Sequence, residues 1–349
     1  MAEQARPARI LITKLKQIGD VLLATPAIGA LRRRFPEARI VALVPKQGAI
    51  VLEGNPHLDG VWTYEQGGRP LVHLLREWRR FRPDWVVELG ITRKERVLGV
   101  LGGGRRRAGF AAAGRAAGLT DAIAFDWSAH VVTNAERLLR SLGVEETLGP
   151  LHLSVREDEV AAVKRRLGQV GVEAQRGLAV VHPVTRWPFK SASHETMAAV
   201  IEGLRDRLGF EVALTAGPEP GESERAVRVR GLVRGSVLDL IGKLALREFA
   251  ALLAATRLVV TVDGAPMHMA AALQVPQVVL FGPTGDANWG PWQAPQVCLR
   301  APFLCRPCGK DGCLGTKVSD CLQAITAEQV LDAAQTLLGT ASSGAVASV

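Results

Sequence analysis

The segment RLVVTVDGAPMHMAAALQVPQVVLFGPTGDANWGPW, residues 257–292, decides the fold class. Its β-branched run Leu258–Val262 predicts a buried strand, and Pro266 then stands where the first turn of a helix favours proline. A short Ala- and Met-rich helix is expected over 267–273, and 277–281 predicts a second buried strand. Strand, helix and strand in so short a segment form a parallel βαβ unit.

The turn of this unit, Asp263-Gly264-Ala265, is the first candidate site. Ligands of parallel sheets gather where the carboxyl end of a strand meets the next helix, whose first amides are unpaired and suit a phosphate. His268 lies in the first turn of that helix, where a neutral imidazole could donate a hydrogen bond to a phosphate oxygen. The alternative interpretation is that Asp263 only stabilises the turn and that His268 is a buried polar residue.

Length and composition indicate a globular protein with two domains. The chain has 349 residues, of which 48% are hydrophobic and 22% charged. The first nine residues are polar, and no run of about 20 uncharged apolar residues occurs. We therefore expect no signal peptide, no membrane span and a cytoplasmic location.

The net charge of +9 predicts an anionic partner, namely a nucleotide, a nucleic acid or an anionic membrane surface. Basic clusters occur at 32–34, 76–82 and 105–107, and each of them can equally be an ordinary solvated surface. A nucleic-acid partner is disfavoured because a single Tyr and 5% aromatic residues leave few stacking platforms.

Strands and helices alternate along both halves of the chain, which predicts two doubly wound α/β domains. In the first half, a strand at 10–15 is followed by a helix at 21–35, with Asp20 as its N-cap, and by further strands at 40–44, 61–63 and 85–89. An extended linker at 149–155 separates the halves. The predicted domains are residues 1–155 and 156–325, with a last helix and tail at 326–349.

Two more loops at strand ends carry candidate residues. Gly19-Asp20 places a carboxylate after the first strand of the N-terminal half. In the C-terminal half, Thr185, Arg186 and Lys190 lie in a loop that suits phosphate oxygens, although Lys190 alone can be a surface lysine.

Three stretches carry a resemblance to a known family. KLKQIGDVLLATPAIGALRRRFP (14–36), HPVTRWPFKS (182–191) and VDGAPMHMAAALQVPQVVLFGPT (262–284), followed by NWGPW, resemble glycosyltransferase family 9, the ADP-heptose:lipopolysaccharide heptosyltransferases. The match runs from residue 10 to about 337, and the cysteine-rich stretch at 305–325 looks most like the branch that adds the third heptose of the inner core.

The resemblance implies a GT-B fold, in which two Rossmann-like domains face one another across a cleft. The acceptor is expected on the N-terminal domain and the ADP-sugar on the C-terminal domain, and the last helix is expected to return to the first domain. The implied enzyme is an inverting heptosyltransferase without a metal or other cofactor. Its implied partners are ADP-heptose and the lipid-anchored lipopolysaccharide core, with peripheral contact at the inner face of the inner membrane through Arg32–Arg34.

The resemblance also implies roles for individual residues. Asp20 matches the catalytic base, in a loop whose Lys14, Lys16 and Gly19 are expected to contact the acceptor. The residues expected to bind the donor are Thr185, Lys190, Asp263, Gly264, Ala265 and His268. An acidic residue should hold the ribose of the donor, and both Glu222 and Glu224 are candidates.

The chain departs from the family pattern in two places. Asp263-Gly264-Ala265 stands where Asp-Thr-Gly is common, so backbone amides must replace a hydroxyl at the phosphate. A histidine common soon after the Gly-Asp pair is absent, with Leu23 or a neighbour in its place.

Cysteines cluster near the end of the chain, at Cys305, Cys308, Cys313 and Cys321. Only one CxxC pair is present, whereas zinc sites usually have two, so structural or buried thiols are favoured over a metal site. Two other functions stay open, a sugar-nucleotide epimerase with a similar fold and a basic nucleic-acid-binding protein.

Overall fold

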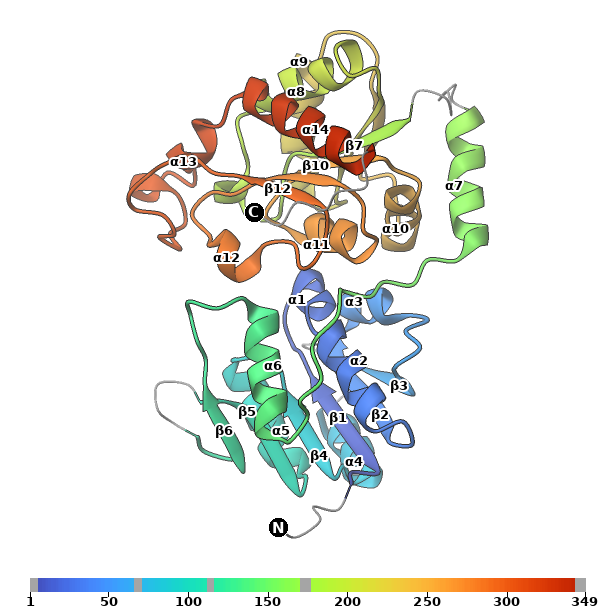
Figure 1. Ribbon diagram of the computed structural model, residues 1–349, viewed down its shortest axis with the longest axis vertical. Coiled ribbons are helices and arrows are strands. Elements are labelled where there is room, and N and C mark those ends of the chain that lie inside the picture. The colour runs from blue at the N-terminus through green and yellow to red at the C-terminus, as the bar shows by residue number, and fades with distance from the viewer. Residues whose placement is uncertain (1–5, 66–70, 112–115, 170–176, 343–349) are drawn as a thin grey trace. The chain divides into compact units, whose positions relative to one another are not determined.

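The computed structural model describes residues 6–65, 71–111, 116–169 and 177–342, and these form two compact units. Unit 1 is Met1–Ser154 and unit 2 is Val155–Val349. Each unit contains one sheet of six parallel strands, so the expected α/β doubly wound architecture is confirmed (Figure 1).

The sheet of unit 1 has the strand order β3-β2-β1-β4-β5-β6. Its strands are β1 (Arg9–Thr13), β2 (Arg39–Pro45), β3 (Gly60–Tyr64), β4 (Trp85–Glu88), β5 (Arg106–Ala111) and β6 (Asp121–Ala124). Its helices are α1 (Ile18–Leu22), α2 (Thr25–Arg34), α3 (Lys46–Ala49), α4 (Leu71–Phe81), α5 (Arg93–Gly102) and α6 (Val131–Ser141), with a 3-10 turn η1 (Ile50–Leu52). Helices α2 and α6 lie together on one face of the sheet, and α4 and α5 lie on the other (Figure 1).

The sheet of unit 2 repeats this topology, with the order β12-β11-β10-β7-β8-β9. Its strands are β7 (Leu178–His182), β8 (Glu211–Ala216), β9 (Leu238–Ile241), β10 (Leu258–Val262), β11 (Gln277–Leu280) and β12 (Gln296–Leu299). Its longer helices are α7 (Glu157–Gln169), α8 (His194–Asp206), α9 (Pro220–Leu232), α10 (Leu246–Ala254), α11 (Ala265–Ala272) and α14 (Ala327–Ser342). Its short helical turns are η2 (Pro188–Lys190), α12 (Asp286–Trp289), η3 (Cys313–Gly315) and α13 (Asp320–Gln323).

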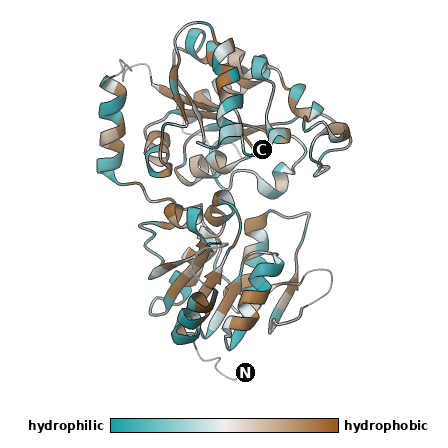
Figure 2. Cartoon of the chain, turned by 180° about the vertical axis from the view of Figure 1, so that it is seen from behind, coloured by the Kyte–Doolittle hydropathy of each residue, from teal (hydrophilic) through white to brown (hydrophobic). Residues whose placement is uncertain are grey.

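Apolar strands form the centre of both units. Figure 2 shows the strands mainly in brown, whereas the outer faces of the helices carry most of the hydrophilic residues. All five residues of β7 and all five of β10 are buried, because helices cover both faces of the sheet. This explains why these strands have continuous rather than alternating hydrophobic sequences.

Two differences from the sequence analysis concern helices. The predicted helix 21–35 is two helices, α1 and α2, with Pro26 in the first turn of α2, because proline lacks the N–H that a helix interior requires. Asp20 consequently lies inside the first turn of α1, and the N-cap position is taken by Gln17. The prediction of Asp20 as the N-cap was wrong.

The last long helix packs within unit 2. Apolar residues of α14 join the core of this unit against α8, β11 and β12, and the expected return of the helix to the first domain stays a prediction. Val330 and Ala334 are completely buried there. The apolar face of the helix is therefore already used within unit 2.

The strand order determines where each unit can bind a ligand. In a doubly wound sheet, the crevice lies outside the carboxyl ends of the strands where the chain order reverses. That switch point lies between β1 and β4 in unit 1 and between β7 and β10 in unit 2.

Candidate functional site

At the switch point of unit 2, the predicted residues Lys190 and Asp263 lie together with Thr284. Lys190 ends the turn after β7, Asp263 follows β10, and Thr284 follows β11. The Lys190 Nζ donates a hydrogen bond to Asp263 Oδ2 over 2.7 Å, and the Thr284 hydroxyl donates to the same oxygen over 2.6 Å. The side chain of Asp263 is only 8% exposed, so this ion pair is largely desolvated. Lys190 is therefore not an ordinary surface lysine.

The start of helix α11 lies directly after Asp263. Gly264 is its N-cap residue, has an extended backbone and provides no side-chain cap, while Pro266 occupies the first turn. The first amides of a helix lack intrahelical partners, so this turn offers N–H donors to an anion. The methyl group of Thr185 lies beside Gly264, where an added Cβ would come within 3.4 Å of it. The structure thus brings Thr185, Gly264 and Ala265 to the same turn.

His268 is buried in α11, with 5% of its surface exposed. The sequence allowed two interpretations of His268, a phosphate ligand or a buried polar residue. Its burial fits the second interpretation, although the residue also lies near the helix start. Its role toward the donor stays a prediction.

The two acidic candidates for the ribose differ in their surroundings. Glu222 folds back from the first turn of α9 onto the end of β8, where the Gly217 N–H donates to its Oε1 over 2.7 Å. Glu224 is exposed. Burial raises the pKa of the Glu222 carboxyl, but hydrogen bonds and the neighbouring His182 outweigh this and leave the pKa below its usual value. Glu222 is therefore the carboxylate held in place at the switch-point edge.

Three residues that the sequence analysis did not select belong to this edge. His182 ends β7 and Thr284 follows β11, and this position at the end of a strand could have identified both residues. Arg225 lies on α9 and donates a hydrogen bond to the Thr185 carbonyl over 2.5 Å. Because its partner is a backbone carbonyl on a distant segment, no spacing in the sequence indicates this contact.

The switch point of unit 1 holds Lys14 and Asp20. The Lys14 Nζ donates a hydrogen bond to the Leu89 carbonyl over 2.9 Å and lies 3.7 Å from Asp20 Oδ1. Lys14 is 4% exposed, and burial lowers the pKa of its ammonium group. The Lys14 ammonium therefore has partners inside the unit, and its expected contact with the acceptor stays a prediction. For half-buried Lys16 and buried Gly19 the acceptor role stays a prediction.

A buried carboxylate, Glu95, shapes the loop that carries Asp20. It accepts the N–H of Leu15 over 2.6 Å and forms a capping box with Thr92 at the start of α5. A side chain at residue 90 would clash with Glu95, since an added Cβ would lie 1.9 Å from its Oε2. Gly90 therefore allows the loop after β4 to approach the loop after β1.

Unit 1 has three other groups that can accept a proton, Asp59, Glu88 and His57. Asp59 is paired with Arg32 over 2.5 Å, and Glu88 is buried against Arg96 over 2.8 Å. His57 faces His152, and burial lowers the pKa of both imidazoles. Asp20 Oδ1 and Glu88 Oε1 are both buried without a hydrogen-bond partner in the part of the chain that the structure describes, but the other oxygen of Glu88 is paired with Arg96.

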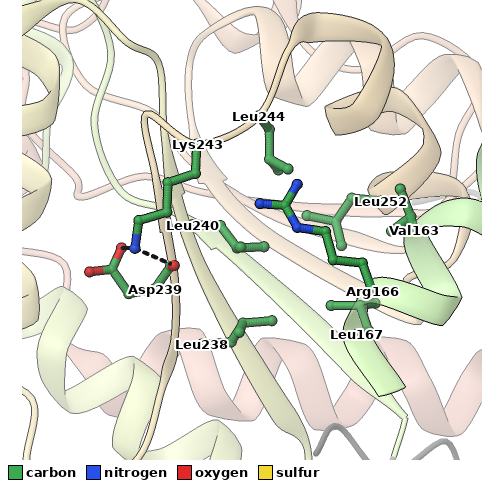
Figure 3. A pocket seen from close by; sticks show the side chains of 9 residues that line it. All are labelled: Val163, Arg166, Leu167, Leu238, Asp239, Leu240, Lys243, Leu244 and Leu252. Atoms are coloured by element: carbon green, nitrogen blue, oxygen red, sulfur yellow. Dashed lines mark hydrogen bonds and ion pairs between the residues drawn. The ribbon is translucent and has the colours of Figure 1, made fainter. Parts of the chain in front are cut away.

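A cavity in unit 2 lies apart from these residues, between α7, β9 and α10 (Figure 3). Its walls are mostly apolar, and its polar side chains include Lys243 and Asp239, which pair with each other. The lining residues are Val163, Arg166, Leu167, Leu238, Asp239, Leu240, Lys243, Leu244 and Leu252. A nucleoside diphosphate requires converging polar groups, so this cavity is not the donor site.

All five cysteines are free thiols, and Cys305 is exposed whereas Cys321 is buried. Burial raises the pKa of the Cys298 thiol to about 12. Over residues 6–65, 71–111, 116–169 and 177–342, no three His, Cys, Asp or Glu side chains are placed to hold a metal ion. Within those same ranges, no helix is both long and apolar enough to cross a membrane.

Each unit has the doubly wound topology of a GT-B domain, and known structures share this fold. E. coli ADP-heptose lipopolysaccharide heptosyltransferase II matches with a TM-score of 0.78 and 23% identity over 96% of this chain and 99% of its own. The glycosyl transferase family 9 structure from Veillonella parvula matches with a TM-score of 0.83 and 25% identity over 95% of this chain and 97% of its own. The epimerase alternative has a distant counterpart, a UDP-GlcNAc 2-epimerase from Methanocaldococcus jannaschii, with a TM-score of 0.51 and 14% identity over 95% and 92%.

The chain belongs to glycosyltransferase family 9 (heptosyltransferase), whose model matches residues 97–319. It is therefore a glycosyltransferase. Lipopolysaccharide heptosyltransferase 3 of E. coli K12 is 27% identical over 286 residues, which cover 78% of this chain and 82% of that protein. Lipopolysaccharide heptosyltransferase 1 of Pseudomonas aeruginosa is 29% identical over 87% of each chain.

Proposed function

We propose that this glycosyltransferase moves a heptose from ADP-L-glycero-β-D-manno-heptose to the inner core of lipopolysaccharide, with inversion at the anomeric carbon. Relatives named lipopolysaccharide heptosyltransferase 3 support the branch that adds the third heptose. The observation that carries the proposal is the cluster of Lys190, Asp263 and Thr284 at the β7/β10 edge, beside the start of α11. Unit 2 would bind the donor there, and unit 1 would bind the acceptor.

On the donor side, Lys190 and the amides of Gly264 and Ala265 would bind the diphosphate. Negative charge grows on the β-phosphate as the bond to the sugar breaks, so cationic and N–H donors placed there lower the barrier. The Thr185 hydroxyl would join them, and Glu222 would bind the ribose. His268 would contribute a donor from the first turn of α11.

On the acceptor side, Asp20 would act as the general base. It would remove a proton from the acceptor hydroxyl, whose oxygen attacks the anomeric carbon opposite the departing ADP. Within the residues that the structure describes, Asp20 Oδ1 is buried without a hydrogen bond, with the Lys14 ammonium 3.7 Å away. This supports the role, because no hydrogen bond occupies the oxygen that would take the proton.

We also propose peripheral contact with the cytoplasmic leaflet of the inner membrane, where the lipid-anchored acceptor would be met. Of the basic cluster at 32–34, Arg32 is held by Asp59 and the carbonyls of residues 36 and 38. Arg33 and Arg34 are exposed, although Arg33 also pairs with Glu146 over 3.8 Å and donates to the Thr147 carbonyl over 3.2 Å. These two arginines are therefore the better candidates. Charge reversal of Arg33 and Arg34 should weaken binding to anionic vesicles, and unchanged binding would exclude this surface.

The proposed function is tested with purified protein, ADP-heptose and a core acceptor that lacks the branching heptose. Mass spectrometry should show the acceptor gaining one heptose. The same analysis of lipopolysaccharide from a strain lacking this protein should show a core without that heptose. An intact core, or conversion of ADP-heptose to an epimer without acceptor, would overturn the proposal.

A further inference from the structure

Among the residues that the structure describes, hydrogen bonds hold the Glu222 carboxylate through only one of its two oxygens. Its Oε1 accepts the Gly217 N–H over 2.7 Å and lies 3.3 Å from His182 Nε2. Its Oε2 makes no hydrogen bond within the residues that the structure describes. The side chain is 12% exposed, so this second oxygen is the one that a ligand at the sheet edge can reach.

His182 contacts Glu222 from the end of β7. It is the last residue of β7 and is 6% exposed, with its ring packed at 5.6 Å from the ring of Phe249. Its Nδ1 lies 3.0 Å from the hydroxyl of Thr215 on the adjacent strand β8. The imidazole therefore links two central strands to the carboxylate on α9.

Nε2 is the ring nitrogen that faces Glu222, and the partner of Nδ1 determines whether Nε2 carries a proton to donate. If the Thr215 hydroxyl donates to Nδ1, the proton of a neutral ring is on Nε2 and points at the carboxylate. If the hydroxyl instead donates to the Val181 carbonyl, 3.3 Å away, its oxygen can accept only from a protonated Nδ1. The first arrangement gives both ring nitrogens a partner, and in it Nε2–H donates to Glu222 Oε1.

We propose that His182 is a positioning residue for donor recognition, which orients Glu222 through Oε1 so that Oε2 is presented to the ribose hydroxyls. This inference rests on the proposed ribose contact of Glu222. A carboxylate free to rotate would lose entropy on binding the sugar, whereas one already fixed by Gly217 and His182 does not. His182 would then determine the preference for a ribonucleotide without touching it.

The experiment compares the affinities of ADP and 2′-deoxy-ADP by calorimetry. The unmodified protein should prefer ADP by about 10- to 100-fold, the usual range for a hydrogen bond to a charged group. His182→Asn reaches the Nδ1 position but not Nε2, so its preference should fall to about threefold or less. His182→Gln carries its amide N–H near the Nε2 position and should restore most of the preference.

Two further variants separate this inference from the proposed function. Glu222→Gln should lose the preference for ADP, and the exposed Glu224→Gln is its matched control and should keep it. A lost preference in Glu222→Gln together with an unchanged one in His182→Asn would overturn the role of His182 while leaving the ribose contact intact. An unchanged preference in Glu222→Gln would overturn both.

Turnover gives a second readout that a purely structural role would not produce. With the acceptor saturating, His182→Asn should raise KM for ADP-heptose by about the factor by which the ADP affinity falls, and leave kcat within about twofold. If His182→Asn does not fold, Thr215→Val removes the Nδ1 partner at equal volume and should lower the ADP preference at least twofold. A folded Thr215→Val protein with the full preference would then overturn the inference.

Discussion

Lys190 and Asp263 are joined by a 2.7 Å hydrogen bond between the ammonium Nζ and the carboxylate Oδ2, across the two strands that flank the switch point of unit 2. The lysine proposed to meet the donor phosphates is therefore held in position before any ligand binds. Thr284 donates to the same oxygen of Asp263. A preorganised cation loses little side-chain entropy when a phosphate reaches it, which strengthens binding.

Replacing Lys190 with Ala should weaken ADP binding by about 10- to 100-fold, because a charge-assisted hydrogen bond to the diphosphate is lost. Calorimetry with ADP measures the change. The matched control is Lys243→Ala, which breaks the exposed ion pair with Asp239 away from the site. Equal ADP affinity in both variants would place the diphosphate elsewhere.

Asp20→Asn should lower turnover by about 10²- to 10⁴-fold, because an amide cannot take the proton from the acceptor hydroxyl. Asp20 is not the N-cap of α1, so the change removes no capping bond. It does remove the negative charge 3.7 Å from the buried Lys14 ammonium, so the melting temperature is measured as the control for folding. ADP affinity should also be preserved, since the donor residues belong to unit 2. A folded variant with near-normal turnover would refute the mechanism.

The stability of unit 1 should depend on Lys14 in alkaline solution. Burial lowers the pKa of Lys14 from 10.5, so the folded chain loses this proton at a lower pH than the unfolded chain does. Below the pKa that Lys14 has in the folded chain, the lysine is protonated in both the folded and the unfolded state. The folded state then bears the full free-energy cost of burying the ammonium group. Between the folded and the unfolded pKa the unfolded state binds more protons, and stability rises with pH.

Lys14→Met removes this dependence. Urea unfolding measured from neutral pH to about 10 should show the free energy of unfolding of the unmodified protein rising relative to that of Lys14→Met. Lys16→Met, at a less buried position of the same loop, is the control. A difference between the two proteins that does not change with pH would contradict the prediction.

Treatment with a chelator should leave activity intact, because Lys190 and the backbone amides of the α11 turn are proposed to meet the charge of the leaving diphosphate. The assay is heptose transfer before and after dialysis against EDTA. Activity lost on dialysis and restored by zinc or another divalent metal would instead support a metal at the cysteine-rich stretch 305–321.

Much of the fold could be predicted from local pattern. The β-branched run of β10, the proline in the first turn of α11 and the apolar β11 are local signals, and together they define a parallel unit. Strands β5, β6, β9 and β12 were missed. Strands β6, β9 and β12 are four-residue edge strands without a distinctive hydrophobic period, and β5 begins with two arginines. Helices α1 and α2 were merged because the apolar pattern continues across the break before Pro26.

The sequence by itself determined the candidate residues, since Asp20, Lys190 and Asp263 each follow a recognisable strand. Only the tertiary structure decided what each of them touches. The Lys14 ammonium, for example, donates to the Leu89 carbonyl, 75 residues away. His182 was not selected, and its partner Glu222 lies 40 residues away. Hydrogen bonds between strand ends depend on which strands lie side by side, and local sequence patterns carry no information about that order.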